Sequence, residues 1–316
     1  MKKIACLFPG QGAQSVGMGK DLFEKNSVAK QCFEEIDKIA GRSLSGLCFA
    51  GPEEELKRTI NTQPTILAMS LACWKAYENA GGPQPHFVAG HSLGEFTALA
   101  AANALPLEAC VRLVDRRARL MEECPPGAMS AVIGMAEEAL ENCCKEAEKE
   151  LPGKVVIVAN FNTGEQLVIS GSPEAVELAG SKAKTGGAKR VIPLPVGGAF
   201  HSPLMSQAAT TFSAELDKWQ ISDARFPVVQ NYDAQGSTSA LQLKEKLSKQ
   251  MPSAVRWSMS VQYMLAQGVD TFIEIGPGKA LTGMVKKIER SANVFNIYDA
   301  ETLEQVLTEL KQTATV

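Results

Sequence analysis

Short apolar runs alternate with longer amphipathic segments along the first 125 residues. Runs of strand length occur at 4–8 and 87–89, and segments of helix length occupy 19–40, 63–80 and the residues that follow Ser92. This alternation is typical of a parallel sheet with helices on both faces. The pattern therefore predicts an α/β fold, with the run at 4–8 as its first buried strand.

The pattern changes after Pro125-Pro126-Gly127. Beyond this point the predicted elements are shorter and follow the β-α-β-β-α-β order of the ferredoxin-like split motif: strands at 129–134, 155–160, 166–170 and 190–196, and helices at 137–150 and 173–185. We therefore predict a small ferredoxin-like subdomain at 128–196, inserted into a large domain built from 1–127 and 197–316. Strand-like runs return in the second piece at 228–229, 271–275 and 294–297.

Composition and charge narrow the class of protein. The 316 residues are enough to bury a large core. The net charge of −3 argues against a nucleic-acid binder, because the basic stripe of such a protein would make the net charge positive. No apolar run approaches the roughly 18 residues of a membrane span, and the run after Lys3 ends at Pro9, too early for a signal peptide. The eight cysteines include no Cys-x-x-Cys pair and there are three histidines, so we expect reduced thiols, a cytoplasmic protein and no metal site.

The stretch Gly90-His91-Ser92-Leu93-Gly94 lies between the predicted strand 87–89 and an alanine-rich helical segment. Glycines two residues before and two residues after a serine allow the sharp turn of a nucleophile elbow, which exposes the hydroxyl to a substrate. The N-terminus of the following helix favours the negative charge that develops there. We therefore take Ser92 as the candidate nucleophile; the alternative is an ordinary turn.

A serine nucleophile needs a base, and the chain offers three histidines. His91 adjoins Ser92, but successive side chains diverge through such a turn, so we expect it to pack or hydrogen-bond locally. His86 precedes the strand and should lie near its opposite end. His201 follows a glycine pair where a loop enters a helix, which suits a base delivered from a second segment; the alternative is a core or capping histidine. No acidic residue stands out to orient it, so Asp233 and a backbone carbonyl both remain open.

Two backbone N–H groups are candidates for stabilising the oxyanion of an acyl transfer. One belongs to Leu93, directly after the nucleophile. The other belongs to Gln11, in the glycine-rich loop 8–14 after the first strand, where the glycines let the backbone approach a ligand closely. A glycine-rich turn by itself also fits a purely structural role.

Arg117 is the one arginine of the predicted helix 107–124 that shares a face with apolar side chains. The other residues on its face are apolar: Leu113, Val114, Leu120, Met121 and Cys124. The opposite face carries the other three arginines, Arg112, Arg116 and Arg119. An unpartnered guanidinium on a buried face costs about 3–5 kcal/mol, so we expect an anion to meet it. That anion is either an internal carboxylate or a substrate carboxylate, which the planar guanidinium can hold through two hydrogen bonds.

Taken together, these residues resemble the malonyl-CoA:acyl carrier protein transacylases of fatty acid synthesis and, more distantly, the acyltransferase domains of polyketide synthases. The resemblance extends from Ile4 to Ile297 and depends on a combination of motifs: Phe8-Pro9-Gly10-Gln11-Gly12, Asn61-Thr62-Gln63-Pro64, Gly90 to Gly94, Arg117 to Met121, Asn160-Phe161-Asn162, Ala199-Phe200-His201-Ser202 and Glu274-Ile275-Gly276-Pro277-Gly278. It implies a large domain of the α/β-hydrolase type with an inserted ferredoxin-like subdomain. This agrees with the division inferred from the residue pattern.

The resemblance also implies roles for the candidate site residues. Ser92 would carry the acyl group and His201 would act as its base. Arg117 would hold the malonyl carboxylate. The backbone N–H groups of Gln11 and Leu93 would bind the oxyanion.

In this family a backbone carbonyl orients the histidine, and the matching position here is Gln250. The stretch 251–254 after it departs from the usual spacing, which leaves the orienting residue in doubt. The bulky ring of Phe200 would crowd the α-carbon of the acyl group and discourage branched acyl groups. Three further residues are implied in substrate binding: Gln63, Met121 and Asn162.

The implied activity is the transfer of a malonyl group from malonyl-CoA to the phosphopantetheine thiol of holo acyl carrier protein, in two steps through a malonyl-serine. The CoA thioester is a substrate, and no permanently bound cofactor or metal is implied. We expect a cytoplasmic monomer that binds neither nucleic acid nor a membrane. Two alternatives are a serine esterase or thioesterase that uses water as acceptor, and a non-catalytic domain that binds CoA or the carrier protein.

Overall fold

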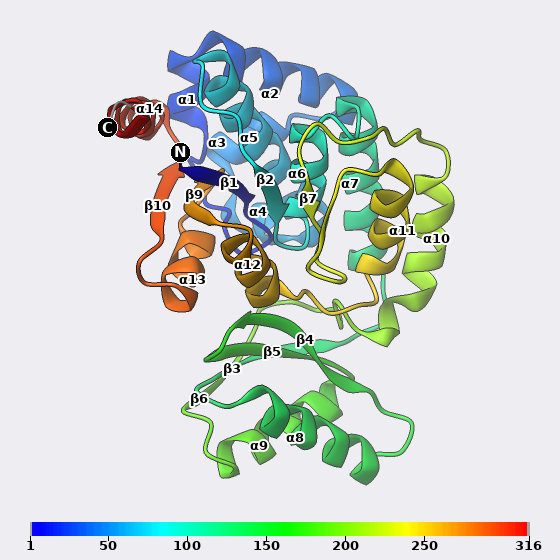
Figure 1. Ribbon diagram of the computed structural model, residues 1–316. Coiled ribbons are helices and arrows are strands. Elements are labelled where there is room, and N and C mark those ends of the chain that lie inside the picture. The colour runs from blue at the N-terminus through cyan, green and yellow to red at the C-terminus, as the bar shows by residue number, and fades with distance from the viewer. Residues whose placement is uncertain (1, 315–316) are drawn as a thin grey trace.

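Two separate sheets form the framework of the computed structural model, which describes residues 2–314 (Figure 1). Within these residues the larger sheet has the strand order β10-β9-β1-β2-β7-β8, and all of its strands except β8 run parallel. The bounds are β1 Lys3–Phe8, β2 Phe87–Gly90, β7 Val228–Val229, β8 Gly236–Ser237, β9 Val269–Ile275 and β10 Asn293–Ile297. The predicted α/β fold with a parallel sheet is confirmed.

Helices cover both faces of the larger sheet, as the alternating pattern predicts. Alternate side chains of β1 enter two separate apolar clusters: Ile4, Cys6 and Phe8 on one face, Ala5 and Leu7 on the other. The second cluster is completed by α12 (Trp257–Ala266) and α13 (Ala280–Ile288). The first receives side chains from the remaining helices around this sheet: α1 Lys20–Lys25, α2 Ser27–Ala40, α3 Leu44–Ala50, α4 Glu53–Lys57, α5 Thr59–Asn79, α6 Gly94–Ala101, α7 Leu107–Glu122, α10 Ser206–Leu216, α11 Ala240–Gln250 and α14 Ala300–Ala314.

The smaller sheet lies at the bottom of Figure 1, with α8 and α9 on its outer side. Its strands are antiparallel in the order β4-β5-β3-β6. The bounds are β3 Ala128–Ile133, β4 Val156–Thr163, β5 Gln166–Gly171, β6 Arg190–Pro193, α8 Glu137–Glu150 and α9 Pro173–Thr185. These elements enclose an apolar cluster of their own around Leu140, Val158 and Ile169. Both helices have the bounds predicted from the sequence.

The chain segments that enter and leave the smaller sheet run side by side. The N–H of Gly127 donates to the carbonyl of Gly197 at 3.0 Å, and Pro126 forms an isolated β-bridge with Gly198. A side chain at Gly127 would overlap the backbone of Ala199, so this close approach requires glycine. The smaller sheet is therefore attached to the larger unit through a closely paired entry and exit.

Several predicted elements need correction. The segment 19–40 is not one helix, because α1 ends at Lys25 and the extended residue Asn26 caps α2 by accepting hydrogen bonds from two N–H groups. The helix expected after His201 begins as a 3₁₀ turn, Pro203–Met205, before α10. Strand β6 ends at Pro193 rather than at residue 196, because a tight turn in which Val196 N donates to Leu194 O follows it; the side chains of Leu194 and Val196 line a cavity.

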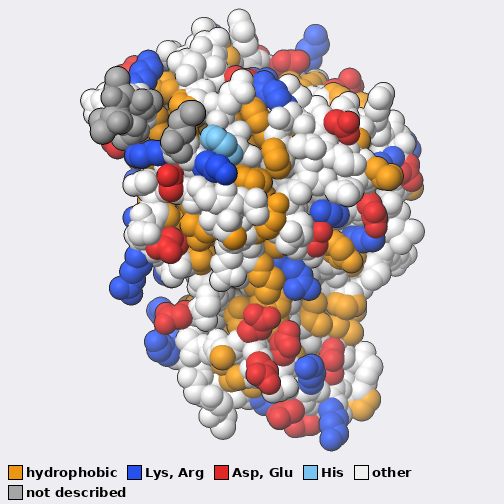
Figure 2. Space-filling model, in the orientation of Figure 1, with side chains coloured by type: hydrophobic (Ala, Val, Ile, Leu, Met, Phe, Trp, Pro, Cys, Tyr) orange, Lys and Arg blue, Asp and Glu red, His pale blue; other side chains and the backbone are white. Residues whose placement is uncertain are grey.

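Charged side chains of both signs are spread over the face shown in Figure 2, and neither sign forms a continuous stripe there. Apolar side chains gather on this face between the two sheets. In the described part of the chain, no helix combines the length and the apolar character needed to cross a bilayer.

Candidate active site

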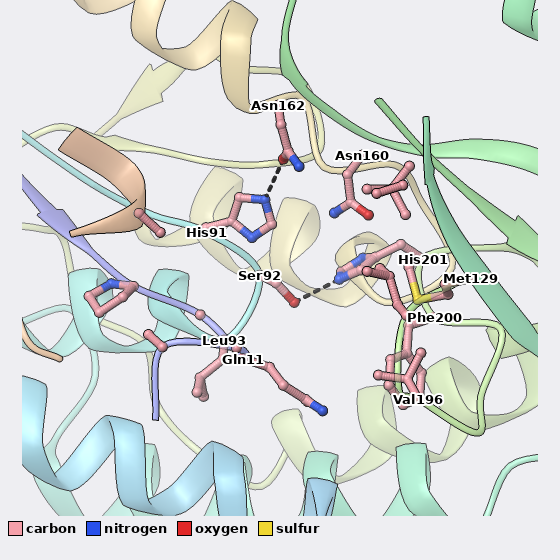
Figure 3. A pocket seen from close by; sticks show the side chains of 18 of the residues that line it. Gln11, His91, Ser92, Leu93, Met129, Asn160, Asn162, Val196, Phe200 and His201 are labelled. Atoms are coloured by element: carbon pink, nitrogen blue, oxygen red, sulfur yellow. Dashed lines mark hydrogen bonds between the residues drawn. The ribbon is translucent and has the colours of Figure 1, made fainter. Parts of the chain in front are cut away.

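A cavity of about 280 Å³ opens between the two sheets and brings the predicted site residues together (Figure 3). Loops at the ends of β1 and β2 form one wall, and β3, β4 and β5 of the smaller sheet contribute to the opposite one. Nine of the ten predicted residues line it: Gln11, Gln63, Ser92, Leu93, Arg117, Met121, Asn162, Phe200 and His201. The tenth, Gln250, contacts the site residues from behind the cavity wall.

The turn after β2 has the geometry of a nucleophile elbow. β2 ends at Gly90 and α6 begins at Gly94, and a side chain at either glycine would overlap backbone atoms packed against it. Ser92 at the apex has a φ of 52°, a conformation that costs a non-glycine residue about 1–3 kcal/mol. The predicted strand, sharp turn and helix are confirmed, and Ser92 Oγ faces the cavity.

The Ser92 hydroxyl and the His201 ring are hydrogen-bonded directly, with 2.6 Å between Oγ and Nε2 (Figure 3). The other ring nitrogen, Nδ1, faces the carbonyl oxygens of Gln250 at 3.2 Å and Ser253 at 3.1 Å. Because a carbonyl oxygen only accepts, Nδ1 carries the ring proton and Nε2 accepts the hydrogen bond from Oγ. His201 is thus held in the tautomer that a general base requires.

Carbonyl oxygens rather than a carboxylate orient the imidazole. Asp233, the acidic alternative, instead pairs with Lys246 Nζ at 2.9 Å. The predicted carbonyl of Gln250 is one of the two contacts, and Ser253 supplies a second that the sequence pattern did not reveal. Ser253 belongs to the stretch 251–254, which is the stretch that departs from the usual spacing of the family.

The surroundings of His201 keep its ring neutral. Burial disfavours the imidazolium, and the positive charge of Arg117 opposes it further, so the pKa of His201 falls to about 3. The residue also has a φ of 57°, in the left-handed region. Both members of the Ser92–His201 pair are therefore held in strained backbone conformations, which are concentrated at functional sites.

Arg117 is a buried cation at the floor of the site. Its Nη1 donates to Gln63 Oε1 at 2.7 Å, and its Nη2 donates to Ser92 Oγ and Gln250 Oε1, each at 3.0 Å. The Phe96 ring lies 5.6 Å from the guanidinium carbon. Burial lowers the pKa of Arg117 to about 10, so the group stays charged at neutral pH.

No carboxylate is hydrogen-bonded to Arg117 within residues 2–314. The carboxylate whose field acts on it is Glu95 in α6, but Glu95 bonds to Gln230 and Asn231 instead. The internal carboxylate that the sequence left open as a direct partner is therefore not found. The guanidinium faces the cavity beside Ser92 with its charge free for an anionic ligand.

The backbone N–H groups of Gln11 and Leu93 reach the cavity without an acceptor among the described residues. Their neighbours in the same turns are bonded: Gly12 N to Gln14 Oε1, Ala13 N to Gly10 O, Ser92 N to Asn231 Oδ1 and Gly94 N to His91 O. A pair of free donors beside a nucleophile suits an oxyanion.

The other two histidines are structural in different ways. His86 lies at the far end of β2 and its Nδ1 accepts from Ile4 N at 3.2 Å, as predicted. His91 does not bond locally: its Nε2 is 2.9 Å from Asn162 Oδ1 on β4, and its ring packs 5.7 Å from Trp257 (Figure 3). The local expectation was wrong because the smaller sheet lies over the elbow.

Several residues of the cavity wall were missed. Asn160 is two residues from Asn162 on β4, so the two-residue period of a strand was a signal that both face the cavity. The apolar part of the wall gave no such signal, because it is assembled from separate segments: Met129, Val168, Leu194, Val196 and Met284. Within residues 2–314, no three His, Cys, Asp or Glu side chains come together to hold a metal ion.

Known proteins resemble this chain over nearly all of its length. The family model of the acyl transferase domain matches residues 6–312. The malonyl CoA-acyl carrier protein transacylase of Bacillus subtilis (strain 168) is 46% identical over 315 residues, which are 99% of this chain and 98% of the relative. The protein of that name from Salmonella typhimurium is 39% identical over 312 residues, or 98% of this chain and 100% of the relative.

Solved structures match the fold equally well. An acyl carrier protein S-malonyltransferase from Vibrio cholerae superposes with a TM-score of 0.93 at 41% identity, covering 96% of this chain and 99% of that one. A malonyl-transacylase solved in complex with a holo type II PKS acyl-carrier protein gives a TM-score of 0.94 at 39% identity, covering 97% and 99%.

Proposed function

This chain belongs to the acyl transferase family, and we propose that it transfers the malonyl group of malonyl-CoA to holo acyl carrier protein, supplying fatty acid biosynthesis. One observation supports malonyl as the acyl group that is transferred. The buried Arg117 guanidinium, with no bonded carboxylate, lies 3.0 Å from the Ser92 hydroxyl. A cation at this distance from a nucleophile selects an acyl group that bears an anion at its far end.

The first step is acylation of Ser92. Oγ attacks the thioester carbonyl as His201 Nε2 takes its proton, and the N–H groups of Gln11 and Leu93 bind the oxyanion. When the tetrahedral intermediate collapses, the C–S bond breaks and His201 returns the proton to the CoA thiolate. A malonyl-serine ester remains, held by Arg117.

The second step repeats this chemistry with a new nucleophile. His201 takes the proton of the phosphopantetheine thiol, and the thiolate attacks the ester carbonyl. The oxyanion occupies the same two N–H groups, and Ser92 Oγ leaves with the proton from His201. Because the malonyl group is bonded to Ser92 between the two steps, the CoA product leaves before the carrier protein reacts and the mechanism is ping-pong.

Four further cavity residues have supporting roles in this proposal. Gln63 Oε1 fixes one arm of Arg117 while its Nε2 lies 3.3 Å from Met121 Sδ. Asn162 bonds to His91 at the rim, and the Phe200 ring lies among apolar side chains next to His201 (Figure 3). Phe200 thereby narrows the space around the α-carbon of the acyl group.

Intact-protein mass spectrometry tests the function as a whole. After incubation with malonyl-CoA, the protein should gain one malonyl group at Ser92, and addition of holo acyl carrier protein should move that group to the carrier. Loss of the adduct at the same rate without the carrier would indicate a hydrolase. No adduct at any time would indicate a non-catalytic binding domain.

Replacing Arg117 with alanine should change the choice of acyl group. We expect kcat/KM for malonyl-CoA to fall about 10²–10³-fold, because the malonyl carboxylate loses its buried partner, and acetyl transfer to change about 10-fold or less. Stopped-flow acylation with both donors measures this. Arg112→Ala is the matched control, since Arg112 pairs on the exposed stripe with Glu108 at 2.9 Å. Equal losses for both donors would mean that Arg117 only braces Gln63 and Gln250.

The pH profile of acylation should lack the acid limb of an ordinary histidine. A histidine with a pKa of about 6.5 loses its neutral form about 25-fold between pH 7 and pH 5, whereas His201 stays neutral there because its pKa is about 3. We expect kcat/KM for malonyl-CoA to change about 2-fold or less over this range. A 10-fold fall in kcat/KM while circular dichroism shows folded protein would contradict this assignment.

The stability of the fold, unlike the activity, should depend on pH in this range. His201 binds a proton below about pH 6.5 in the unfolded chain but stays neutral in the folded one, so the free energy of unfolding declines below about pH 6.5.

We also propose the finer division of the fold. Residues 2–127 and 197–314 would form an α/β-hydrolase-like catalytic domain, and 128–196 an inserted ferredoxin-like subdomain; the predicted ends at 1 and 315–316 lie outside the described residues. The β4-β5-β3-β6 order with two helices on one side and the separate apolar cluster support this. Hydrogen exchange in which both sheets open as a single unit would contradict the boundary.

Eight free and mostly buried thiols support a cytoplasmic location, where thiols stay reduced. Burial raises the pKa of all eight thiols, so they are inert rather than nucleophilic. The reaction needs no permanently bound cofactor, since the CoA thioester is itself the substrate. That the protein acts as a monomer stays a prediction.

A further inference from the structure

We propose that Asn231 is a positioning residue that holds the nucleophile elbow in its strained conformation and ties it to the segment that orients His201. Asn231 follows the end of β7, the strand beside β2, and it is 1% exposed. The inference rests on the proposed function, because it assigns a residue to the same acyl transfer.

The Asn231 side chain bridges the first half of the elbow, from Gly90 to the apex at Ser92. Its Oδ1 accepts from the backbone N–H of Ser92 at 2.7 Å, and its Nδ2 donates to the carbonyl of Gly90 at 2.7 Å. One amide thus satisfies two buried backbone groups that the sharp turn leaves without a partner in the helix or the sheet. Without the amide, both groups would be buried and unpaired.

The contact to Ser92 bears directly on the chemistry. Ser92 keeps its φ of 52° only while its surroundings oppose relaxation. The same backbone atoms set where Oγ points and where the next N–H, that of Leu93, is aimed. If Ser92 relaxes, Oγ moves away from His201 and one oxyanion donor moves away from the carbonyl oxygen it must bind. Displacements of about 1 Å at such a centre can cost about 10²-fold in rate.

The backbone of Asn231 anchors this amide on two sides. Its N–H donates to Glu95 Oε2 at 2.8 Å, and its carbonyl accepts from Arg256 N at 3.1 Å. Glu95 lies in the first turn of the helix that follows the elbow. Arg256 ends the short segment that begins at Ser253, whose carbonyl holds His201 Nδ1. A single residue therefore connects the nucleophile with the segment that orients its base.

Replacing Asn231 with alanine should slow the chemistry while leaving binding intact. We expect the rate of Ser92 malonylation at saturating malonyl-CoA to fall about 10²-fold, because Oγ and the Leu93 donor lose their alignment. KM should change about 3-fold or less. The Asn231 side chain contacts only backbone groups of Gly90 and Ser92, and it does not contact Arg117 or the two glutamines that hold the guanidinium.

The matched control is Gln230→Ala, one residue earlier. Gln230 is also fully buried, and its Nε2 donates to Glu95 Oε1 at 3.1 Å and to Leu243 O at 3.0 Å, but it does not touch the elbow. The two variants remove the same number of buried hydrogen bonds. We expect both to lower the melting temperature, and the malonylation rate of Gln230→Ala to stay within about 3-fold of wild type.

The variant Asn231→Asp supplies a second readout. A protonated carboxyl reproduces both amide contacts, because it accepts from Ser92 N and donates to Gly90 O. An ionised one places an acceptor against the Gly90 carbonyl and loses that bond. Activity relative to wild type should therefore be close to 1 at pH 5 and should fall toward that of Asn231→Ala by about pH 8.

Charged and titratable groups near position 231 influence this titration, the Asp233–Lys246 ion pair and Tyr232 among them. Burial and the neighbouring Glu95 raise the pKa of an introduced carboxyl, whereas the cations of Arg117 and Arg256 lower it. His201 stays neutral throughout the range, because its pKa is about 3. Burial raises the pKa of Glu95, but Glu95 is present in wild type as well, so the ratio of the variant to wild type reports on position 231.

Three results would overturn the inference: an unchanged malonylation rate in folded Asn231→Ala, an equal rate loss in Gln230→Ala, or a ratio of Asn231→Asp to wild type that does not depend on pH. Wild-type protein measured beside the variants keeps the two hypotheses apart. If wild type forms no malonyl-serine, the proposed function fails. If wild type forms it and the variants match it, only the role of Asn231 fails.

Discussion

Ser92→Ala is expected to abolish both the malonyl adduct and the transfer to acyl carrier protein. Removing the nucleophile of a triad-like site costs about 10⁶-fold in kcat, which brings the rate to background. The loss is this large because Ser92 Oγ is the atom that forms the covalent bond in the first step and leaves in the second. Among the described residues, Ser92 supplies the hydroxyl bonded to His201, with 2.6 Å between Oγ and Nε2.

The measurement is intact mass after incubation with malonyl-CoA, followed by a transfer assay with holo acyl carrier protein. Ser70→Ala is the control, because it deletes a serine hydroxyl that is fully buried, does not line the cavity and has no hydrogen-bond partner among the described residues. It should retain the adduct and the transfer rate. An undiminished adduct in Ser92→Ala would move the nucleophile to another residue.

His201→Ala is expected to slow malonylation by about 10²–10⁴-fold. The alanine variant has no group to take the proton from Ser92 Oγ, and the protonated hydroxyl is a weak nucleophile. Some activity should remain, because the N–H groups of Gln11 and Leu93 and the guanidinium of Arg117 still bind the transition state. Stopped-flow acylation measures the residual rate, and it should respond to pH differently from wild type because the base is gone.

The other two histidines provide the comparison for this prediction. His86→Ala should transfer malonyl groups at the wild-type rate, since His86 lies at the far end of β2, bonded to Ile4 N. His91→Ala should have an intermediate effect, because it loses the contact to Asn162 in the cavity wall but leaves the proton path in place. A larger loss in His91→Ala than in His201→Ala would assign the base to His91.

The elbow could be predicted because its constraints are local. Gly90 is required by the backbone of Gly94 and Glu95 within the turn itself, and the apolar run before Ser92 and the alanine-rich segment after it identify the strand and the helix. Helices α8 and α9 were predicted with their observed bounds for a similar reason. Their 3.6-residue periodicity and their flanking residues are properties of the segment alone.

Predictions failed where the decisive neighbour lies far away in the sequence. The break in the segment 19–40 is an exception, because Asn26 makes it through capping bonds to Val28 and Ala29 within the same segment. His91 was expected to bond locally, but a strand 71 residues away supplies its partner. The carbonyl of Ser253 and the amide of Asn231 carried no signal in the residue pattern, because their roles depend on which groups meet at the ends of separate strands.

For Arg117, the sequence predicted the burial of the side chain but not the identity of its hydrogen-bond partners. The helical period of 107–124 was sufficient to place it on the buried face, since that period depends only on the order of residues. Its partners were not predictable from that order: Gln63 lies 54 residues before it and Gln250 lies 133 residues after it. The absence of a bonded carboxylate, which makes the guanidinium available to malonyl, is a property of the folded chain.

The sequence by itself determined the α/β class, the serine at the turn and the arginine on a buried helical face, because strand, turn and helix patterns are short-range. Tertiary structure alone decided that His201 is oriented by two carbonyls, that its pKa is lowered by burial and by Arg117, and that Asn231 joins the elbow to Ser253. The physical reason is that hydrogen bonds and electrostatic fields act over a few ångströms in space, whatever the separation along the chain.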